Sequence, residues 1–219
     1  MLSFSKRNLI ATGLALSLLA LTGCSQSQNY AADKVSGTYI AVPKDWHKIG
    51  KSQLNSAESK STAAGAEEKL ANVVWQEAYS TSPEVTASEV LKLQAPKEAI
   101  VYVRVRDLNY DEMNSVSYNN LRNLIVPITT WLEDPAKAGS KFVLLDDYER
   151  VEKVARGVRT IYTFSDSAGV SETVDQTALV AEDRSRIYVL IVRAESNYYK
   201  KHAKILQAIG DSFTVRGDK

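Results

Sequence analysis

The sequence predicts an α+β fold in which helices cover both faces of one antiparallel β-sheet, an α/β/α sandwich. Strand patterns follow one another in the second half of the chain with only short polar turns between them, which is typical of an antiparallel meander. The segment Arg186–Ala194 (RIYVLIVRA) is apolar on both faces, so we expect a central strand covered on both sides. The helical pattern Asn197–Ile209 follows it directly and supplies one cover.

Length and composition favour one globular domain. The chain has 219 residues, of which 44% are hydrophobic and 24% charged. Without Lys6 and Arg7, which belong to the leader described next, 25 basic and 26 acidic side chains remain. A domain this close to neutrality has no electrostatic basis for binding nucleic acid, and it presents no polybasic surface to a membrane.

The first 23 residues have the pattern of a cleaved leader. Lys6 and Arg7 precede an uncharged apolar run, Leu9–Leu21, whose 13 residues are too few to span a bilayer. The run ends in the sequence Leu-Thr-Gly-Cys at positions 21–24, which resembles the lipobox of bacterial lipoproteins. This resemblance implies cleavage before Cys24, the only cysteine, and a diacylglyceryl thioether on it. An ordinary secretory signal with a chance cysteine, or an uncleaved anchor, are the alternatives.

The anchor predicts where the protein resides. We expect it on the extracytoplasmic face of the cell membrane, or on the outer membrane if the source has one, since Ser25 rather than Asp follows the cysteine. Residues 24–36 are small and polar and predict a flexible tether, and residues 37–216 are expected to form the domain.

The first half of the domain mixes short elements. Strands are predicted at Gly37–Val42, Asn72–Ser80 and Ala99–Leu108, and a short helix at Thr86–Leu93 with Thr86 or Ser88 as its N-cap. The stretch Lys51–Lys69 is rich in Ser, Ala, Glu and Lys, and predicts an exposed loop with at most one helical turn.

The second half begins with a helical pattern and continues with strands. Apolar residues recur at helical spacing in Ser115–Leu132, where Pro127 should kink or restart the helix. The predicted strands that follow lie within Lys141–Ala155, Val158–Phe164, Glu172–Ala181 and Arg186–Ala194. The helix Asn197–Ile209, capped by Ser196 and Gly210, should pack with one face, formed by Tyr198, His202, Ile205, Leu206 and Ile209.

The order of these patterns resembles the PsbP-like and Mog1-like superfamily. The chain has a strand and a turn ending in tryptophan (Val42-Pro43-Lys44-Asp45-Trp46), and near its end a two-faced strand, a helix and Ser212-Phe213. The resemblance covers Ser36–Val215, and the stretch Lys51–Lys69 departs from it. It implies a binding or adaptor role, because members dock onto protein complexes or other partners and are not known as a class for catalysis.

Candidate catalytic and metal-binding residues are few. His47 and His202 have no second histidine or cysteine at ligand spacing, and no G-x-S-x-G motif or Gly-rich phosphate loop is present. Two acidic clusters, Asp146/Asp147/Glu149 and Asp107/Asp111/Glu112, lack the spacing of a calcium loop, and solvated loops are the favoured interpretation. A pocket lined by tyrosines is the other possibility that we consider, formed by Tyr102, Tyr188, Tyr198 and Tyr199.

These observations predict a membrane-tethered binding or accessory module rather than an enzyme. We expect no catalytic residue, no metal and no cofactor apart from the lipid on Cys24. The expected partners are the membrane and an envelope protein or a small apolar ligand. A cell-envelope hydrolase or a solute-binding lipoprotein of a transporter are the alternative functions.

Overall fold

The computed structural model describes residues 28–138 and 142–217. Its strands are β1 Gln28–Asp33, β2 Thr38–Pro43, β3 His47–Ile49, β4 Val73–Ser80, β5 Ile100–Asp107, β6 Val143–Val151, β7 Ala155–Ser165, β8 Ser171–Ala181, β9 Arg186–Glu195 and β10 Thr214–Val215. Its helices are α1 Lys51–Glu58, α2 Ala66–Ala71, α3 Ala87–Val90, α4 Tyr110–Ser115, α5 Tyr118–Arg122, α6 Ile128–Glu133, the 3-10 helix η1 Pro135–Ala138, α7 Ser196–Lys201 and α8 Ala203–Ser212. Within these residues no helix is long and apolar enough to cross a membrane.

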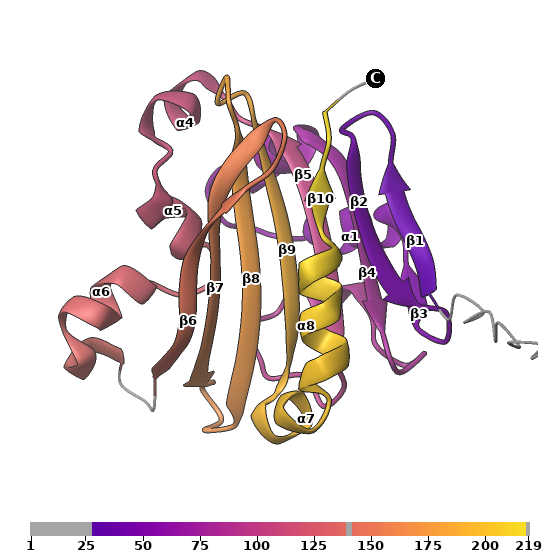
Figure 1. Cartoon of the computed structure of the whole chain (residues 1–219), viewed down its shortest axis with the longest axis vertical. Coiled ribbons are helices and arrows are strands. Elements are labelled where there is room, and N and C mark those ends of the chain that lie inside the picture. Colours follow the sequence, from indigo (N-terminus) through magenta and orange to yellow (C-terminus); the bar gives the residue numbers. More distant parts are fainter. Residues whose placement is uncertain (1–27, 139–141, 218–219) are drawn as a thin grey trace, which may run out of the picture.

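Two antiparallel sheets organise the molecule (Figure 1). The large sheet has the order β3-β4-β5-β9-β8-β7-β6, and the small sheet has the order β1-β2-β10. Strand β9 lies between β5 and β8, so the prediction of a central strand at Arg186–Ala194 is confirmed. Strands β6 to β9 pair consecutively as the predicted meander.

Both faces of the large sheet are covered. On one side, here called the α8 face, α8 packs against β8, β9 and the small-sheet strand β2. The core of this face includes Val101, Val103 and Val105, all fully buried, as their alternation in β5 predicts. On the other side, the α5 face, α5 packs against β7 and β8, and α1 packs against β4. The predicted α+β sandwich is therefore confirmed. The α8 face is covered by α8 together with the small sheet.

The predicted tether is wrong for residues 28–36. Gln28–Asp33 form strand β1, which pairs with the whole of β2, from Gln28 opposite Pro43 to Asp33 opposite Thr38. The turn between the strands is held by the Ser36 N–H, which donates to the Asp33 carboxylate over 2.8 Å, and by Gly37 at φ +62°. Most side chains of β1 are exposed, so the strand depends on main-chain pairing and carries little apolar pattern. Residues 1–27, including Cys24 and the leader, lie outside the described part of the chain.

The predicted loop at Lys51–Lys69 contains two helices. Helix α1 buries only Leu54, so its apolar pattern is weak, and the side chain of Gln53 accepts from the Gly50 N–H at its start. Glu58 at its end accepts two hydrogen bonds from Arg104 on β5, over 2.7 and 2.8 Å. Contacts with a distant strand therefore hold a segment whose local sequence looks like a loop.

The two long helices predicted from periodicity are each divided. The region Ser115–Leu132 forms the last residue of α4, then α5 and α6, and the predicted restart at Pro127 is confirmed because this residue caps α6. The C-terminal helix breaks at His202, where α7 ends and α8 begins. Glu195 rather than Ser196 caps α7, and Gly210 lies inside α8 instead of ending it. Leu206 and Ile209 are buried as predicted, but Ile205, which lies in the same helix, is 49% exposed.

Candidate functional site

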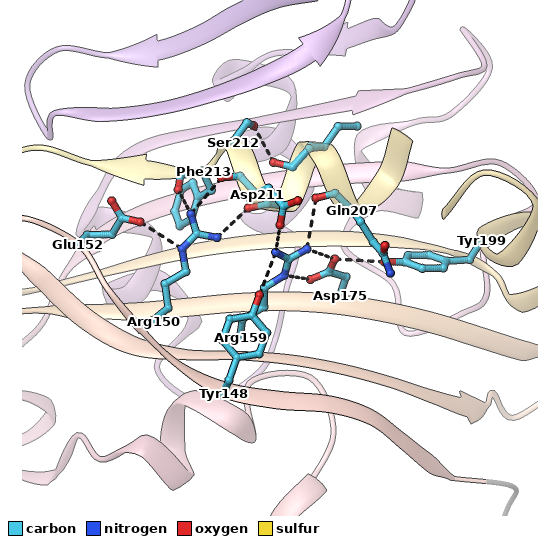
Figure 2. A network of polar contacts seen from close by, with 12 residues as sticks. Tyr148, Arg150, Glu152, Arg159, Asp175, Tyr199, Gln207, Asp211, Ser212 and Phe213 are labelled. Carbon is cyan, nitrogen blue, oxygen red and sulfur yellow. Dashed lines mark hydrogen bonds and ion pairs between the residues drawn. The ribbon is translucent and has the colours of Figure 1, made fainter. Parts of the chain in front are cut away.

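Two buried groups of charged side chains lie on opposite faces of the large sheet. On the α8 face, Arg159 of β7 and Asp175 of β8 are diagonal neighbours on adjacent strands, and both side chains are almost fully buried. Arg159 Nε donates to Asp175 Oδ1 over 2.8 Å and Nη2 donates to Oδ2 over 2.7 Å, which is a bidentate pair (Figure 2). Tyr199 of α7 donates its hydroxyl to the same carboxylate over 3.1 Å.

This pair attaches α8 to the sheet. Arg159 Nη2 donates to the Gln207 carbonyl over 3.3 Å, and Nη1 contacts the carboxylate of Asp211 and the Tyr148 hydroxyl. Burial disfavours the charge of Arg159, but the hydrogen bonds that it donates to the carboxylates of Asp175 and Asp211 outweigh this effect and raise its pKa. A Cβ on Gly210 would overlap Arg159 Nη2, so only glycine allows the helix to approach this closely.

A second arginine completes the attachment at the end of α8. Arg150 of β6 donates to the carbonyl of Gly210 over 3.0 Å, to that of Asp211 over 3.2 Å, and to that of Phe213, while Glu152 pairs with its Nε (Figure 2). These carbonyls lie at or just beyond the C-terminal end of α8, where a helix has few N–H donors of its own left to offer them. Because the groups of this network satisfy one another, we assign it to the stability of the fold.

The second group lies on the α5 face and is less completely satisfied. Glu172 of β8 is fully buried, and Arg193 Nη1 of β9 lies 3.3 Å from its Oε1. Neither carboxylate oxygen has a hydrogen-bond partner. Burial raises the pKa of Glu172 to about 7 although Arg193 opposes the shift. Burial also lowers the pKa of Arg193.

Tyr162 of β7 belongs to the same group. Its hydroxyl is buried without a hydrogen-bond partner, and its pKa is raised by burial first and by the charge of Glu172 second. Arg193 is thus a buried cation beside a carboxyl and a phenol that are not hydrogen-bonded. Such an arrangement costs free energy of folding unless other contacts compensate it. Perturbed titratable groups of this kind are often found at functional sites.

Arg193 also fixes the segment between α3 and β5, residues 91–99. Its Nη2 donates to the Lys92 carbonyl over 2.6 Å and to the Glu89 carbonyl over 3.2 Å. Farther along the segment, the Ala95 N–H donates to the Asp166 carboxylate over 3.0 Å. The segment has no regular secondary structure, so these side chains from β9 and the β7–β8 turn determine its position.

An apolar cavity of about 200 Å³ lies where this segment meets the sheet. Arg193 forms part of its wall, and Leu93 and Leu124 on its lining are 56% and 42% exposed. The other lining residues are Val90, Leu91, Lys92, Tyr102, Ile125 and Ile191. An apolar lining with one buried cation suits a compact apolar group that carries an acid. A more polar hollow of about 380 Å³ is lined by residues 94–98 of the same segment.

The side chains singled out by sequence are not brought together. Nδ1 of His202 lies 3.0 Å from the Tyr198 carbonyl and its ring packs against Tyr198, so it is partly buried as a structural residue, while His47 is exposed at the start of β3. The proposed tyrosine pocket is wrong, because Tyr102 lies on the α5 face whereas Tyr188 and Tyr199 lie in the core of the α8 face.

The acidic clusters bind arginines. Asp147 pairs with Arg122, and Glu112 pairs with Arg106. Asp107 likewise pairs with an arginine, Arg186 of β9. Across residues 28–138 and 142–217, no three His, Cys, Asp or Glu side chains are grouped so that they could hold a metal ion.

Sequence reasoning missed Glu172 and Arg193. The signal was present, because Arg193 continues the alternation of Ile187, Val189 and Ile191, which places it on an apolar face of a central strand. A charge at such a position must find a partner across the sheet, and Glu172 is the neighbouring acid on β8.

These observations define the class of protein as an antiparallel α/β/α sandwich with an apolar cavity beside a buried ion pair. No family model and no curated protein matches the sequence. Among solved structures, the chain is similar to cyanobacterial PsbP from Synechocystis, at 12% identity over 91% of this chain and 99% of that one, with a TM-score of 0.49.

Two other solved structures are similar to the chain at equally low sequence identity. LpqN of Mycobacterium tuberculosis, described as involved in cell envelope biogenesis, is 12% identical over 86% of this chain and 90% of its own, with a TM-score of 0.45. The Ran-binding protein Mog1p of Saccharomyces cerevisiae is 11% identical over 86% and 95%, with a TM-score of 0.41. Similarities this distant leave the function to be argued from the residues of this chain.

Proposed function

We propose that this protein is a lipoprotein tethered through Cys24 to the extracytoplasmic face of a membrane, where it acts as a binding or accessory module and not as a catalyst. The observation that carries the tether is the sequence Leu21-Thr22-Gly23-Cys24 at the end of a short apolar run behind two basic residues. The chain has one cysteine, which cannot form a disulfide within the chain, whereas lipid attachment accounts for its position.

The interior of the domain supports the non-catalytic half of the proposal. Arg159, Asp175 and Arg150 are used to hold α8. In the part of the chain that the structure describes, no hydrogen bond joins the side chain of either histidine to a serine, a threonine or a carboxylate, the contacts that general-base catalysis by histidine requires.

The cavity beside Arg193 is the candidate binding place. Its lining is mostly apolar, with the buried Arg193 and the exposed Lys92 as its two cations, and the exposed leucines at positions 93 and 124 mark its rim. A ligand with a short hydrocarbon part and a carboxylate would bury apolar surface against the lining and meet the charge of Arg193. The cavity equally supports the alternative function, a solute-binding lipoprotein of a transporter, because such a protein would also bind a small ligand in a cavity.

The tether is tested by replacing Cys24 with alanine in the full chain. We expect the variant to leave the membrane fraction and to lose labelling by a fatty-acid analogue, because the thiol that carries the lipid is gone. Ser25→Ala is the matched control and should remain labelled and membrane-bound. Labelling that persists in Cys24→Ala would refute the tether.

Binding is tested with octanoate, titrated while methyl resonances are followed by NMR. We expect shifts at Leu93, Leu124 and Ile191, and an affinity reduced about tenfold or more in Leu93→Asp, which places a like charge at the rim. Leu132→Asp is the control, since Leu132 on α6 is 46% exposed and does not line the cavity. Equal affinity in the two variants, or no shift at the cavity, would contradict this site.

A further inference from the structure

The distance between the lipid and the folded domain is short. Strand β1 begins at Gln28, so only residues 25–27 separate it from Cys24. Four Cα–Cα steps of about 3.6 Å allow at most about 14 Å between Cys24 and Gln28. The flexible tether expected from the sequence, which extended to Ser36, would have allowed about three times that distance.

The strand registers show which end of the domain is close to the anchor. Gln28 pairs with Pro43, and the chain then turns into β3, whose His47 pairs with Ser80. Ser80 pairs with Ile100, which itself pairs with Arg193. We call this the tethered end, and it comprises residues 28, 43–47, 80–100, 165–171 and 195–201. It is the lower part of the molecule in Figure 1, with α7 and the β7–β8 turn at the bottom and the start of β1 somewhat higher at the right.

The opposite end, called the far end, holds the β6–β7 turn around Lys153 and the β8–β9 turn around Glu182. It is at the top of Figure 1. Strands β7 and β8 have 11 residues each and connect the two ends, so the ends lie about 35 Å apart at roughly 3.3 Å per residue. This separation exceeds the reach of the tether more than twofold.

We propose that the tethered end faces the lipid headgroups and that the far end points away from the membrane. The inference rests on the proposed lipid at Cys24. A folded domain does not enter the hydrocarbon, so a tether of about 14 Å keeps the Gln28 end of β1 at the bilayer surface.

Charge does not provide this orientation. The exposed cations of the tethered end are Lys44, Lys92, Lys97, Lys200 and Lys201. Exposed acids lie among them, namely Asp45, Glu84 and Glu89. Such a mixed surface gains little from anionic lipid, so the orientation should persist at high salt.

The test uses the lipoprotein purified from membranes and reconstituted into vesicles. Because lipid occupies the sulfur of Cys24, an introduced cysteine is the only free thiol. Asp45→Cys and Lys97→Cys place a fluorophore at the tethered end, and Lys153→Cys and Glu182→Cys place it at the far end. All four positions are exposed, so the substitutions leave the core unchanged. A nitroxide on the lipid headgroup acts as the quencher.

We expect quenching at positions 45 and 97 to be at least threefold stronger than at 153 and 182, with the same ratio at 0.5 M NaCl. Equal quenching at the four positions, as from a domain lying on its side or turning freely, would overturn the proposal, and so would the reverse order. Flotation of each variant with vesicles is measured first. Failure to float would contradict the lipid anchor itself and is distinguished in this way from a wrong orientation.

Discussion

At the scale of single residues, Glu172 is the side chain whose protonation the fold alters most clearly. It is fully buried, its oxygens accept no hydrogen bond, and burial raises its pKa from 4.5 to about 7. The neighbouring Arg193 stabilises the charged form without restoring the lost solvation. This differs from Asp175, whose oxygens each accept from Arg159. Both acids are buried beside an arginine, so the position of that arginine decides whether the carboxylate oxygens are hydrogen-bonded.

This difference predicts a pH dependence of stability. The folded state holds the proton of Glu172 up to about pH 7, whereas the unfolded chain loses it near pH 4.5. Between these values the folded state binds more protons, so the free energy of unfolding should fall as pH rises, by up to about 3 kcal/mol. Below pH 4.5 both states are protonated and the contribution is fully present.

Glu172→Gln, which cannot ionise, isolates this contribution. Urea denaturation of both proteins from pH 4 to pH 8 should show the stability of the wild type, measured relative to the variant, declining across the window from pH 4.5 to pH 7. A constant difference would mean that Glu172 titrates at its ordinary pKa.

At the scale of elements, those with a strong apolar pattern form as predicted and those with a weak pattern do not. Strand β5 alternates cleanly and forms as expected. Strand β1 and helix α1 each bury a single side chain, Ala31 and Leu54. Such segments are held by main-chain pairing or by a distant ion pair, and periodicity does not report these contacts. Periodicity also fails to report the break at His202, because the apolar spacing continues from α7 into α8.

Strand β1 should contribute measurably to stability. A chain beginning at Gln28 keeps all six residue pairs between β1 and β2, and a chain beginning at Val35 loses them together with the buried Ala31. Removing β1 also leaves β2 as an exposed edge, which favours aggregation. We expect both chains to melt cooperatively, with the shorter one destabilised by about 2–4 kcal/mol, since each hydrogen bond contributes about 1 kcal/mol and the entropy cost of ordering β1 offsets part of the sum.

Thermal and chemical denaturation of the two chains provides the measurement. Equal midpoints would show that residues 28–34 add nothing to the fold. In that case the distance from the anchor to the first stable element would be longer than the orientation proposed above assumes.

At the scale of the whole molecule, the two ends of the sandwich differ in what they carry. The cavity beside Arg193 and the hollow next to it both lie against residues 82–100, which belong to the tethered end. The attachments of α8 by Arg150 gather instead at the C-terminal end of that helix, where the chain continues into β10 and the small sheet. In the proposed orientation, the cavity therefore lies closer to the membrane than the contacts of Arg150 with α8 do.

The sequence by itself determined the α+β class, the central position of β9 and most strands, and it predicts the leader and the lipid site at Cys24. These features are local or periodic, so their signal is contained in neighbouring residues. The tertiary structure alone decided that residues 28–36 belong to the domain, that Lys51–Lys69 contains two helices, that Ile205 faces solvent, and that Glu172 meets Arg193 beside a cavity. Each of these depends on which strand lies next to which, and residues far apart in the chain, such as Glu58 and Arg104 or Gln28 and Pro43, leave no local pattern to read.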